Sequence, residues 1–216
     1  MEDVLDLYEA PPDPKRPKVC FDELPYQIVA ETRTAIPAQP AREGTPGRPG
    51  RPARVDYEYR RNGTANLFMS FDPDRGWRHV SVTARRTKRD FAHEMRHLVD
   101  VSYPDAEMIR LVADNLNTHT AAALYETFPP AEARRIARKL EFHYTPKHGS
   151  WLNQAEIELS VLSGQCLDRR MGDRPTLERE VATWNAERNE QQATVVWRFT
   201  SAAARTKMHR VYPAVL

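Results

Sequence analysis

Two short apolar segments of the sequence each lead directly into an aspartate. Residues 19–21 precede Asp22, and residues 111–113 precede Asp114. In open α/β sheets the ends of central strands border the ligand crevice, so carboxylates at two such ends can lie close together. Carboxylates bind divalent cations, and two such cations activate a water or hydroxyl and stabilise the leaving oxygen in phosphoryl transfer. The pattern is therefore compatible with metal-dependent phosphoryl transfer, although by itself it favours a structural role for both aspartates.

A site of this kind needs a third acidic residue, and the residues alone leave that choice open. Glu23, Glu156 and Glu158 are the candidates. Helical geometry does not separate Glu156 from Glu158, because at about 100° per residue the two flank opposite edges of one apolar stripe. The alternative interpretation of both aspartates is structural, since an aspartate after a strand often caps a turn or the next helix.

The elements that must position these acids alternate between strands and helices. Turns are predicted at Asn62-Gly63 and from Asp72 to Gly76, and the apolar run before Asp114 predicts a strand buried on both faces. The order of elements predicts an α/β fold with a mixed sheet, antiparallel in its middle and flanked by helices. Strands are expected at 19–21, 55–63, 65–71, 77–83, 108–114 and 140–146, and helices at 87–103, 121–139 with a break at Pro129-Pro130, 151–166, from Asp173 onward and at 201–210.

Length and composition allow one sizeable domain with appendages. The chain has 216 residues, and an apolar content of 40% suffices for a hydrophobic core. We expect an extended lead-in at 1–16, a main domain at 17–190 with a Pro/Arg-rich loop at 36–54, and a C-terminal strand/helix extension at 191–216 packed on that domain. Cys20 and Cys166 lie in apolar segments, which favours buried, reduced thiols over a disulfide.

The sequence also bears on location. No apolar run approaches the ~20 residues needed to cross a bilayer. The first residues are acidic and Pro-rich, without the basic start and apolar stretch of a secretory signal. We therefore expect a cytoplasmic protein that does not act at a membrane.

Three motifs in order along the chain resemble bacterial transposases of the insertion-sequence-630 family, which belong with the mariner-like elements. The first is Val-Cys-Phe-Asp-Glu at residues 19–23, and the second is Asp114-Asn115 followed by His119. The third is a set of residues at fixed spacing that ends with the last acid. This chain has one extra residue between the first two members of the set, Pro146 and Ser150. The set comprises Pro146, Ser150, Leu152, Asn153 and Glu156, and the similarity as a whole covers roughly residues 17 to 212.

This resemblance implies a DDE endonuclease domain of the ribonuclease-H-like fold. Asp22 would bridge two divalent metal ions, Mg²⁺ or Mn²⁺, while Asp114 would bind one and Glu156 the other. The implied reaction is hydrolysis at the ends of a mobile element in bacterial DNA, followed by attack of a 3′-hydroxyl on target DNA. A homodimer is implied as well, because two element ends must be paired. Residues expected beside the site are Glu23, Asn115, His119 and Asn153.

Two features depart from the family pattern. The 41 residues between Asp114 and Glu156 are more than is usual in mariner-like relatives. Such transposases also carry an N-terminal helix-turn-helix region that recognises the element's ends, and about twenty residues before Asp22 leave no room for it. A separately encoded helix-turn-helix protein would supply that function. The rival hypothesis is a non-catalytic remnant that at most binds DNA.

Basic residues gather in one part of this nearly neutral chain. Its net charge is +2, yet residues 42–61 hold six arginines against three acids, which favours a polyanionic partner. The Pro-Gly-Arg repeats resemble AT-hooks, which insert arginine into the minor groove, although a solvated spacer has the same composition. The candidate DNA-binding residues are Arg48, Arg51, Arg54, Arg60, Arg61, Lys147 and His148.

The sequence His93-Glu94-Met95-Arg96-His97 matches the zinc metalloprotease pattern HExxH on a predicted helix. Zinc would need both histidines to face a cleft and a third ligand. At about 100° per residue, however, His93 and His97 point away from the apolar stripe that contains Phe91. A solvated helix face is therefore the favoured interpretation, and the zinc protease is the less favoured one.

Overall fold

A computed structural model describes residues 1–34, 37–46, 48–52 and 57–209. Its centre is a five-stranded sheet in the order β3-β2-β1-β4-β5. The strands are β1 (Lys18–Ala30), β2 (Arg60–Asp72), β3 (Trp77–Thr83), β4 (Ile109–Ala113) and β5 (Leu140–Tyr144). β1 pairs antiparallel with β2 and parallel with β4, while β2 and β3 are antiparallel and β4 and β5 parallel. The predicted mixed sheet is confirmed, but its antiparallel part, β3-β2-β1, forms one side of the sheet and not the middle, because the central strand β1 pairs parallel with β4.

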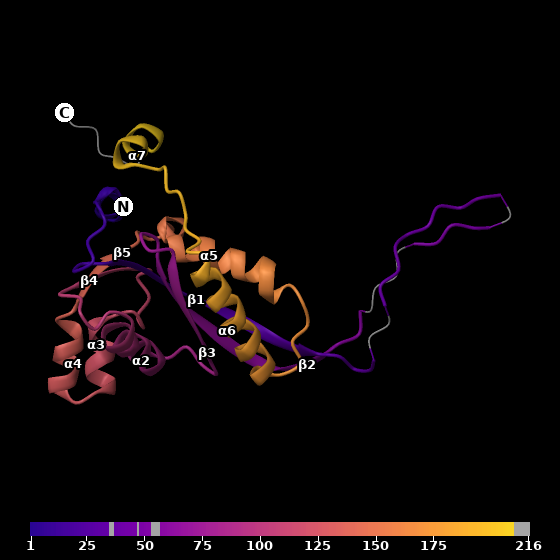
Figure 1. Ribbon diagram of the computed structural model, residues 1–216, viewed down its shortest axis with the longest axis horizontal. Helices are drawn as coiled ribbons and strands as arrows, with labels where there is room; N and C mark the ends of the chain where they lie inside the picture. Colours follow the sequence, from indigo (N-terminus) through magenta and orange to yellow (C-terminus); the bar gives the residue numbers. More distant parts are fainter. Residues whose placement is uncertain (35–36, 47, 53–56, 210–216) are drawn as a thin grey trace.

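Helices cover both faces of this sheet (Figure 1). One layer consists of α2 (Lys88–His97) with its π-helical continuation Leu98–Ser102, α3 (Ala121–Thr127) and α4 (Pro130–Ala137). The other consists of α5 (Gln154–Leu162) with its π-helical continuation Ser163–Leu167, and α6 (Arg174–Glu190). The strands alternate between the layers as their period of two requires, because Phe68 packs in the first core while Leu67 and Met69 pack in the second.

The first two strands are longer than the residue pattern predicted. The expected turn at Asn62-Gly63 is wrong, because residues 60–72 form one continuous strand. The β1–β2 register shifts between Gln27 and Val29, opposite this dipeptide, and Gly63 takes a φ of +96° there. Asn-Gly therefore marks a β-bulge here, since glycine accepts the positive φ that a bulge can require. The second predicted turn is confirmed, with Gly76 at a φ of +60° between β2 and β3.

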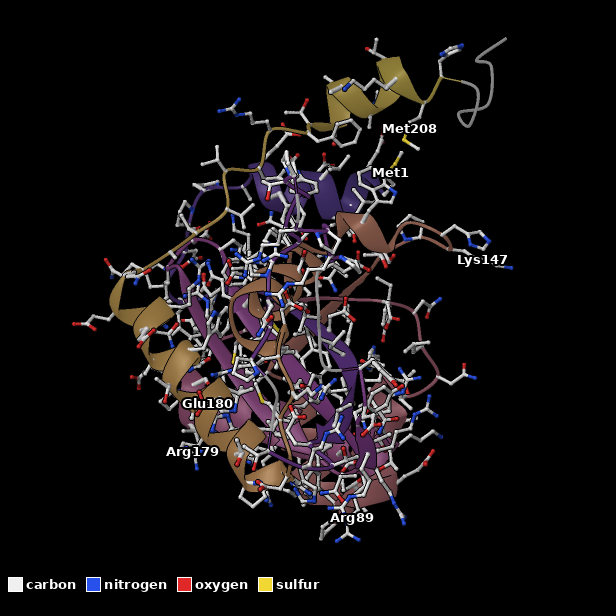
Figure 2. All side chains as sticks on the ribbon, turned by 90° about the vertical axis from the view of Figure 1, so that its right-hand side faces the viewer. Met1, Arg89, Lys147, Arg179, Glu180 and Met208 are labelled. Carbon is white, nitrogen blue, oxygen red and sulfur yellow. The ribbon has the colours of Figure 1, made fainter. Side chains whose placement is uncertain are left out.

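The two terminal segments also differ from expectation. Part of the predicted extended lead-in is the helix α1 (Glu2–Glu9), whose residues Val4 and Leu5 are fully buried. Helical spacing of these apolar residues was the missed signal, and the prolines that follow end the helix. In the described part of the C-terminal extension there is a helix, α7 (Ser201–Lys207), and no strand. Both views show α7 lying over α1 (Figures 1 and 2).

The segment between β1 and β2 projects from the body as a long arm (Figure 1). Two isolated antiparallel bridges, Arg42 with Arg51 and Thr45 with Arg48, hold its two sides together. The expected Pro/Arg-rich loop is therefore a narrow ribbon along its described residues. Arg54 and residues 55 and 56 of the expected strand lie outside the described residues.

Two smaller predictions can be compared with the structure directly. Cys20 and Cys166 are both buried and free, as expected. Within the described ranges, no helix combines the length and the apolar character needed to cross a membrane.

Candidate active site

Asp22 and Asp114 lie at the same level of neighbouring parallel strands. The register pairs Cys20 of β1 with Val112 of β4. Asp22 and Asp114 each follow two residues later in the sequence. Asp114 follows the last residue of β4, as predicted. Asp22 does not end its strand, because β1 continues to Ala30 against β2 after β4 has stopped. The crevice forms where β4 ends, and Asp22 borders it from the middle of β1.

Asn153 joins the helix that carries Glu156 to the strand that carries Asp22. Its side-chain oxygen caps α5 by accepting a hydrogen bond from the Ala155 amide at 3.2 Å. Its side-chain amide donates to the Phe21 carbonyl at 2.8 Å and to the Asp22 carboxylate at 3.3 Å. Because Glu156 lies in the first turn of α5, this fully buried asparagine brings the glutamate to the edge where Asp22 lies.

Four acidic residues form what we call the carboxylate cluster: Asp22, Glu23, Asp114 and Glu156. Burial, together with the negative charges of Asp114, Glu156 and Glu23, raises the pKa of Asp22 to about 7, although a hydrogen bond from the Glu23 amide opposes the shift. All three carboxylates are therefore close enough to Asp22 to repel its negative charge. A group of mutually repelling carboxylates is the environment that a hard divalent cation relieves.

His119 lies between two members of this cluster. Its Nδ1 is 2.5 Å from Asp114 Oδ1, and its Nε2 is 2.8 Å from Glu23 Oε2. Burial alone lowers the pKa of His119, but the contacts with Asp114 and Glu23 outweigh it and raise the pKa to about 9. The imidazole is held against the rings of Phe21 and Phe91, so its orientation is set by packing as well as by charge.

Glu158, the other acid of α5, is engaged elsewhere. Its two carboxylate oxygens contact Arg78 Nε at 3.2 Å and Arg188 Nη2 at 2.7 Å. The Glu158 side chain is 1% exposed and that of Arg78 is fully buried. Removing a buried carboxylate from two guanidinium groups is costly, so Glu158 is unsuited to bind a metal. Among the three candidates for the third acid, Glu156 is the one on α5 whose charge acts on Asp22.

The donor set of the carboxylate cluster suits Mg²⁺ or Mn²⁺, because both prefer carboxylate oxygens. Within the described residues, no three acidic, histidine or cysteine side chains already surround a common point as metal ligands do. Asp114 and Glu23 instead contact His119, and Asp22 contacts Asn153. Binding a metal would therefore turn these carboxylates from their present partners toward the ion.

Other predicted residues lie outside the cluster. Asn115 is exposed in the loop after β4, and Lys147 and His148 are exposed in the loop before α5. Lys147 projects from the body (Figure 2). Arg60, Arg61, Arg48 and Arg51 are exposed at the far end of β2 and on the arm. Ala30 at the base of the arm lies eight positions after Asp22 along β1, which is roughly 26 Å of strand.

The HExxH residues His93, Glu94 and His97 line one pocket, but their side chains contact different partners there. The His97 ring stacks on His79 of β3 at 4.2 Å, whereas the His93 ring meets Phe128 edge-on at 5.2 Å. Glu94 accepts a hydrogen bond from Ser81 at 2.6 Å. The prediction that both histidines face water was wrong in part, since each is half-buried. Their different neighbours provide no support for a zinc protease.

Two residues near the cluster were missed by the sequence analysis. Arg86 Nη1 lies 3.6 Å from Glu23 Oε1, and Tyr8 of α1 contacts the start of α5. No local sequence pattern indicates that Arg86 lies near the cluster, because it belongs to a basic stretch that is typical of solvated surface. Tyr8 would have been suspected if the helical spacing of Val4, Leu5 and Tyr8 had been followed.

Comparison with known proteins defines the class first. The solved structure of the Mos1 strand transfer complex matches 88% of this chain with a TM-score of 0.57 at 15% sequence identity. The chain spans 53% of the Mos1 chain that it matches. The five-stranded mixed sheet flanked by helices is thus a ribonuclease-H-like fold, as the sequence analysis predicted.

The family follows from the sequence itself. The profile described as "DDE superfamily endonuclease" matches residues 19–178, most of the chain. The protein therefore belongs to the DDE superfamily of endonucleases, whose members generally use divalent metal ions. No curated protein sequence matches this chain significantly.

Proposed function

We propose that this chain is the catalytic domain of a DNA transposase that cleaves and joins DNA strands with two divalent metal ions. Asp22, Asp114 and Glu156 are the proposed ligands, and Mg²⁺ or Mn²⁺ the proposed ions. One observation carries the proposal: Asp22 and Asp114 stand in register where β4 ends, and Asn153 ties the first turn of α5, which carries Glu156, to the Asp22 carboxylate. The membership in the DDE superfamily supports it.

When bound, the two metal ions would activate a water or a 3′-hydroxyl and stabilise the leaving oxygen at phosphorus. The protein's own residues hold the carboxylates. Asp22 is connected to both other proposed ligands, because its strand pairs with the strand that leads to Asp114 and its carboxylate accepts a hydrogen bond from Asn153, the cap of the helix that carries Glu156. Asn153 fixes α5, and with it Glu156, against β1. His119 orients Asp114 and offsets part of the negative charge of the cluster.

The proposed substrate is DNA, bound through its phosphates by basic side chains. Lys147 and His148 lie in the loop that leads to α5, so they are placed to contact DNA beside the cluster. Arg48, Arg51, Arg60 and Arg61 would contact DNA far from the cluster, along the arm and its base. Contacts this far from the cluster would suit a DNA substrate that extends well beyond the cleavage point. The arginines would position DNA without reading its sequence.

The motif resemblance extends the proposal to the insertion-sequence-630 type of element. In that case two copies of the chain would pair the element's ends, and recognition of those ends would come from a helix-turn-helix region. The second candidate function is DNA binding without chemistry. The exposed arginines of the arm favour it, because they are compatible with a phosphate-binding surface whether or not the cluster is active.

A nicking assay on supercoiled plasmid with Mg²⁺ or Mn²⁺ separates the two candidates. Glu156→Gln should abolish metal-dependent nicking and leave DNA binding intact, because it removes one negative ligand without disturbing a buried contact. Glu187→Gln, at an exposed position on α6, is the matched control and should nick normally. A purified wild-type chain that binds DNA and never nicks would leave the non-catalytic function as the conclusion.

A further inference from the structure

The helix α1 packs directly behind the carboxylate cluster. Val4 and Leu5 of α1 share a buried core with Cys20 of β1 and with Leu152 and Ala155 at the start of α5. Cys20 lies two residues before Asp22, and Ala155 immediately precedes Glu156. The backbone segments that carry two of the proposed metal ligands therefore rest on this N-terminal helix.

Tyr8 makes the polar contacts of this interface. Its hydroxyl donates a hydrogen bond to the Leu152 carbonyl at 2.8 Å and accepts one from the Gln154 amide at 3.4 Å. The same oxygen lies 3.4 Å from Cys20 Sγ. Burial raises the pKa of Tyr8 well above its usual range, so the phenol remains a neutral donor. One hydroxyl thus bridges β1 and the turn that begins α5.

The position of these contacts matters more than their number. Leu152 and Gln154 flank Asn153, the residue that caps α5 and contacts Asp22. Tyr8 therefore holds the peptide groups on both sides of the asparagine. A small rotation of this turn would move Asn153 away from Asp22 and change the direction of Glu156 in the first helical turn.

α1 is itself held from outside by α7. The Ser201 hydroxyl contacts Asp6 at 2.6 Å, the Ser201 amide donates to Glu9 at 2.8 Å, and Arg205 Nε donates to Glu2 at 2.5 Å. Trp197 covers Tyr8 with its ring edge-on at 5.3 Å. Figure 2 shows the same arrangement, with Met1 and Met208 close together above the body.

We propose that Tyr8 is a positioning residue of the carboxylate cluster: its hydroxyl sets the turn at Asn153 and thereby the distance and direction of Glu156 relative to Asp22. The inference rests on the proposed function and adds to it. In this proposal α1 and α7 together form a brace: they hold β1 and the start of α5 in place, so that Asp22 and Glu156 can bind the same divalent metal ions. Tyr8 acts through this turn and does not touch the metal or DNA.

The test compares Tyr8→Phe with Tyr26→Phe. The two variants are matched, because Tyr26 also donates to a main-chain carbonyl, that of Arg169 at 3.1 Å, far from the start of α5. Mn²⁺ binding is measured by electron paramagnetic resonance, and nicking is measured as a function of Mg²⁺ and of DNA concentration. Thermal unfolding of each variant reports the loss of stability.

Tyr8→Phe should weaken Mn²⁺ binding about fivefold, the effect expected from one net hydrogen bond. The Mg²⁺ concentration for half-maximal nicking should rise by a similar factor while the KM for DNA stays unchanged. Tyr26→Phe, which removes a more exposed hydrogen bond, should lower Tm no more than Tyr8→Phe does and should leave metal binding as in the wild type. If Tyr8→Phe does not fold, Ser201→Ala loosens the brace from outside and carries the same expectation.

Two results would overturn the inference, and they are distinguishable. Equal Mn²⁺ affinity in Tyr8→Phe, Tyr26→Phe and the wild type would reduce Tyr8 to a structural role while leaving the proposed function intact. A wild-type chain that neither binds Mn²⁺ nor nicks DNA would overturn the proposed function, and the positioning role with it.

Discussion

Glu158 and Arg78 form a fully buried ion pair between α5 and β3, with 3.2 Å between Oε2 and Nε. Glu156 precedes Glu158 by two residues and so lies about 200° away around the helix. The buried pair holds one face of α5 toward β3 and α6, and the opposite face is left for Glu156. A residue without a proposed role in chemistry thus determines which acid of α5 reaches the cluster.

Replacing the two glutamates should therefore separate stability from activity. Glu158→Gln leaves the fully buried guanidinium group of Arg78 and the partly buried one of Arg188 without this counter-charge. We expect a loss of about 3–5 kcal/mol in unfolding free energy. Glu156→Gln should leave the unfolding free energy nearly unchanged or slightly raised, because it removes one of the repelling carboxylates. Urea unfolding of both variants at pH 7 measures this. A larger loss for Glu156→Gln would mean that the roles are reversed.

Trp151 should contribute to binding of single-stranded DNA. Its side chain is 43% exposed in the short turn before α5 and rests edge-on against Phe199. Stacking of one base on an exposed aromatic ring contributes about 1–3 kcal/mol. Trp151→Ala should therefore weaken binding of a single-stranded oligonucleotide by roughly tenfold, measured by fluorescence anisotropy. Trp151→Phe keeps an aromatic face and should restore most of the affinity, whereas equal affinity in both variants would contradict stacking.

The arm should determine much of the salt dependence of duplex binding. Each phosphate contact releases counterions, so log K falls with log salt concentration at a slope of roughly −0.9 per contact. Replacing Arg48 and Arg51 together by alanine should make that slope shallower by about 2, if each arginine meets one phosphate. Arg16→Ala is the control, because Arg16 pairs with Glu141 on the body at 2.6 Å. An unchanged slope in the double variant would exclude DNA contact by these arginines.

The stacked pair His79 and His97 should make stability depend on pH. Burial, with a smaller contribution from His97, lowers the pKa of His79 to about 4. The folded protein therefore binds a proton at His79 less readily than the unfolded chain, whose histidines titrate near pH 6.5. The stability associated with His79 is fully present above pH 6.5 and is lost as the pH falls toward 4.

His79→Phe should flatten this dependence. The ring can still stack on His97, and the variant should lose less unfolding free energy than the wild type between pH 7 and pH 5, by urea unfolding. His97, Glu94, Arg96 and Asp100 border the same pocket and remain in both proteins, so the difference between the two curves isolates His79. Parallel curves would show that His79 does not titrate in this range. His209→Gln, at an exposed position, should leave the curve unchanged.

The sequence determined those features that depend on local pattern. The apolar run before Asp114 predicted β4, and the apolar positions of 87–103 predicted α2, because strand and helix periods are visible within a few residues. The choice of Glu156 came from a motif rather than from helical spacing. Three motifs in order also identified the superfamily, which the match over residues 19–178 confirms.

Only the tertiary structure decided the features that depend on residues far apart in the chain. Asp22 looked like the end of a strand, yet β1 runs on because β2 pairs with it beyond the point where β4 stops. Glu158 is excluded from the proposed site by Arg78 and Arg188, which come from two other elements. Asp22 and Glu156 are 134 positions apart in the numbering, and Asn153 and Tyr8 join their strand and helix through contacts that no local pattern encodes.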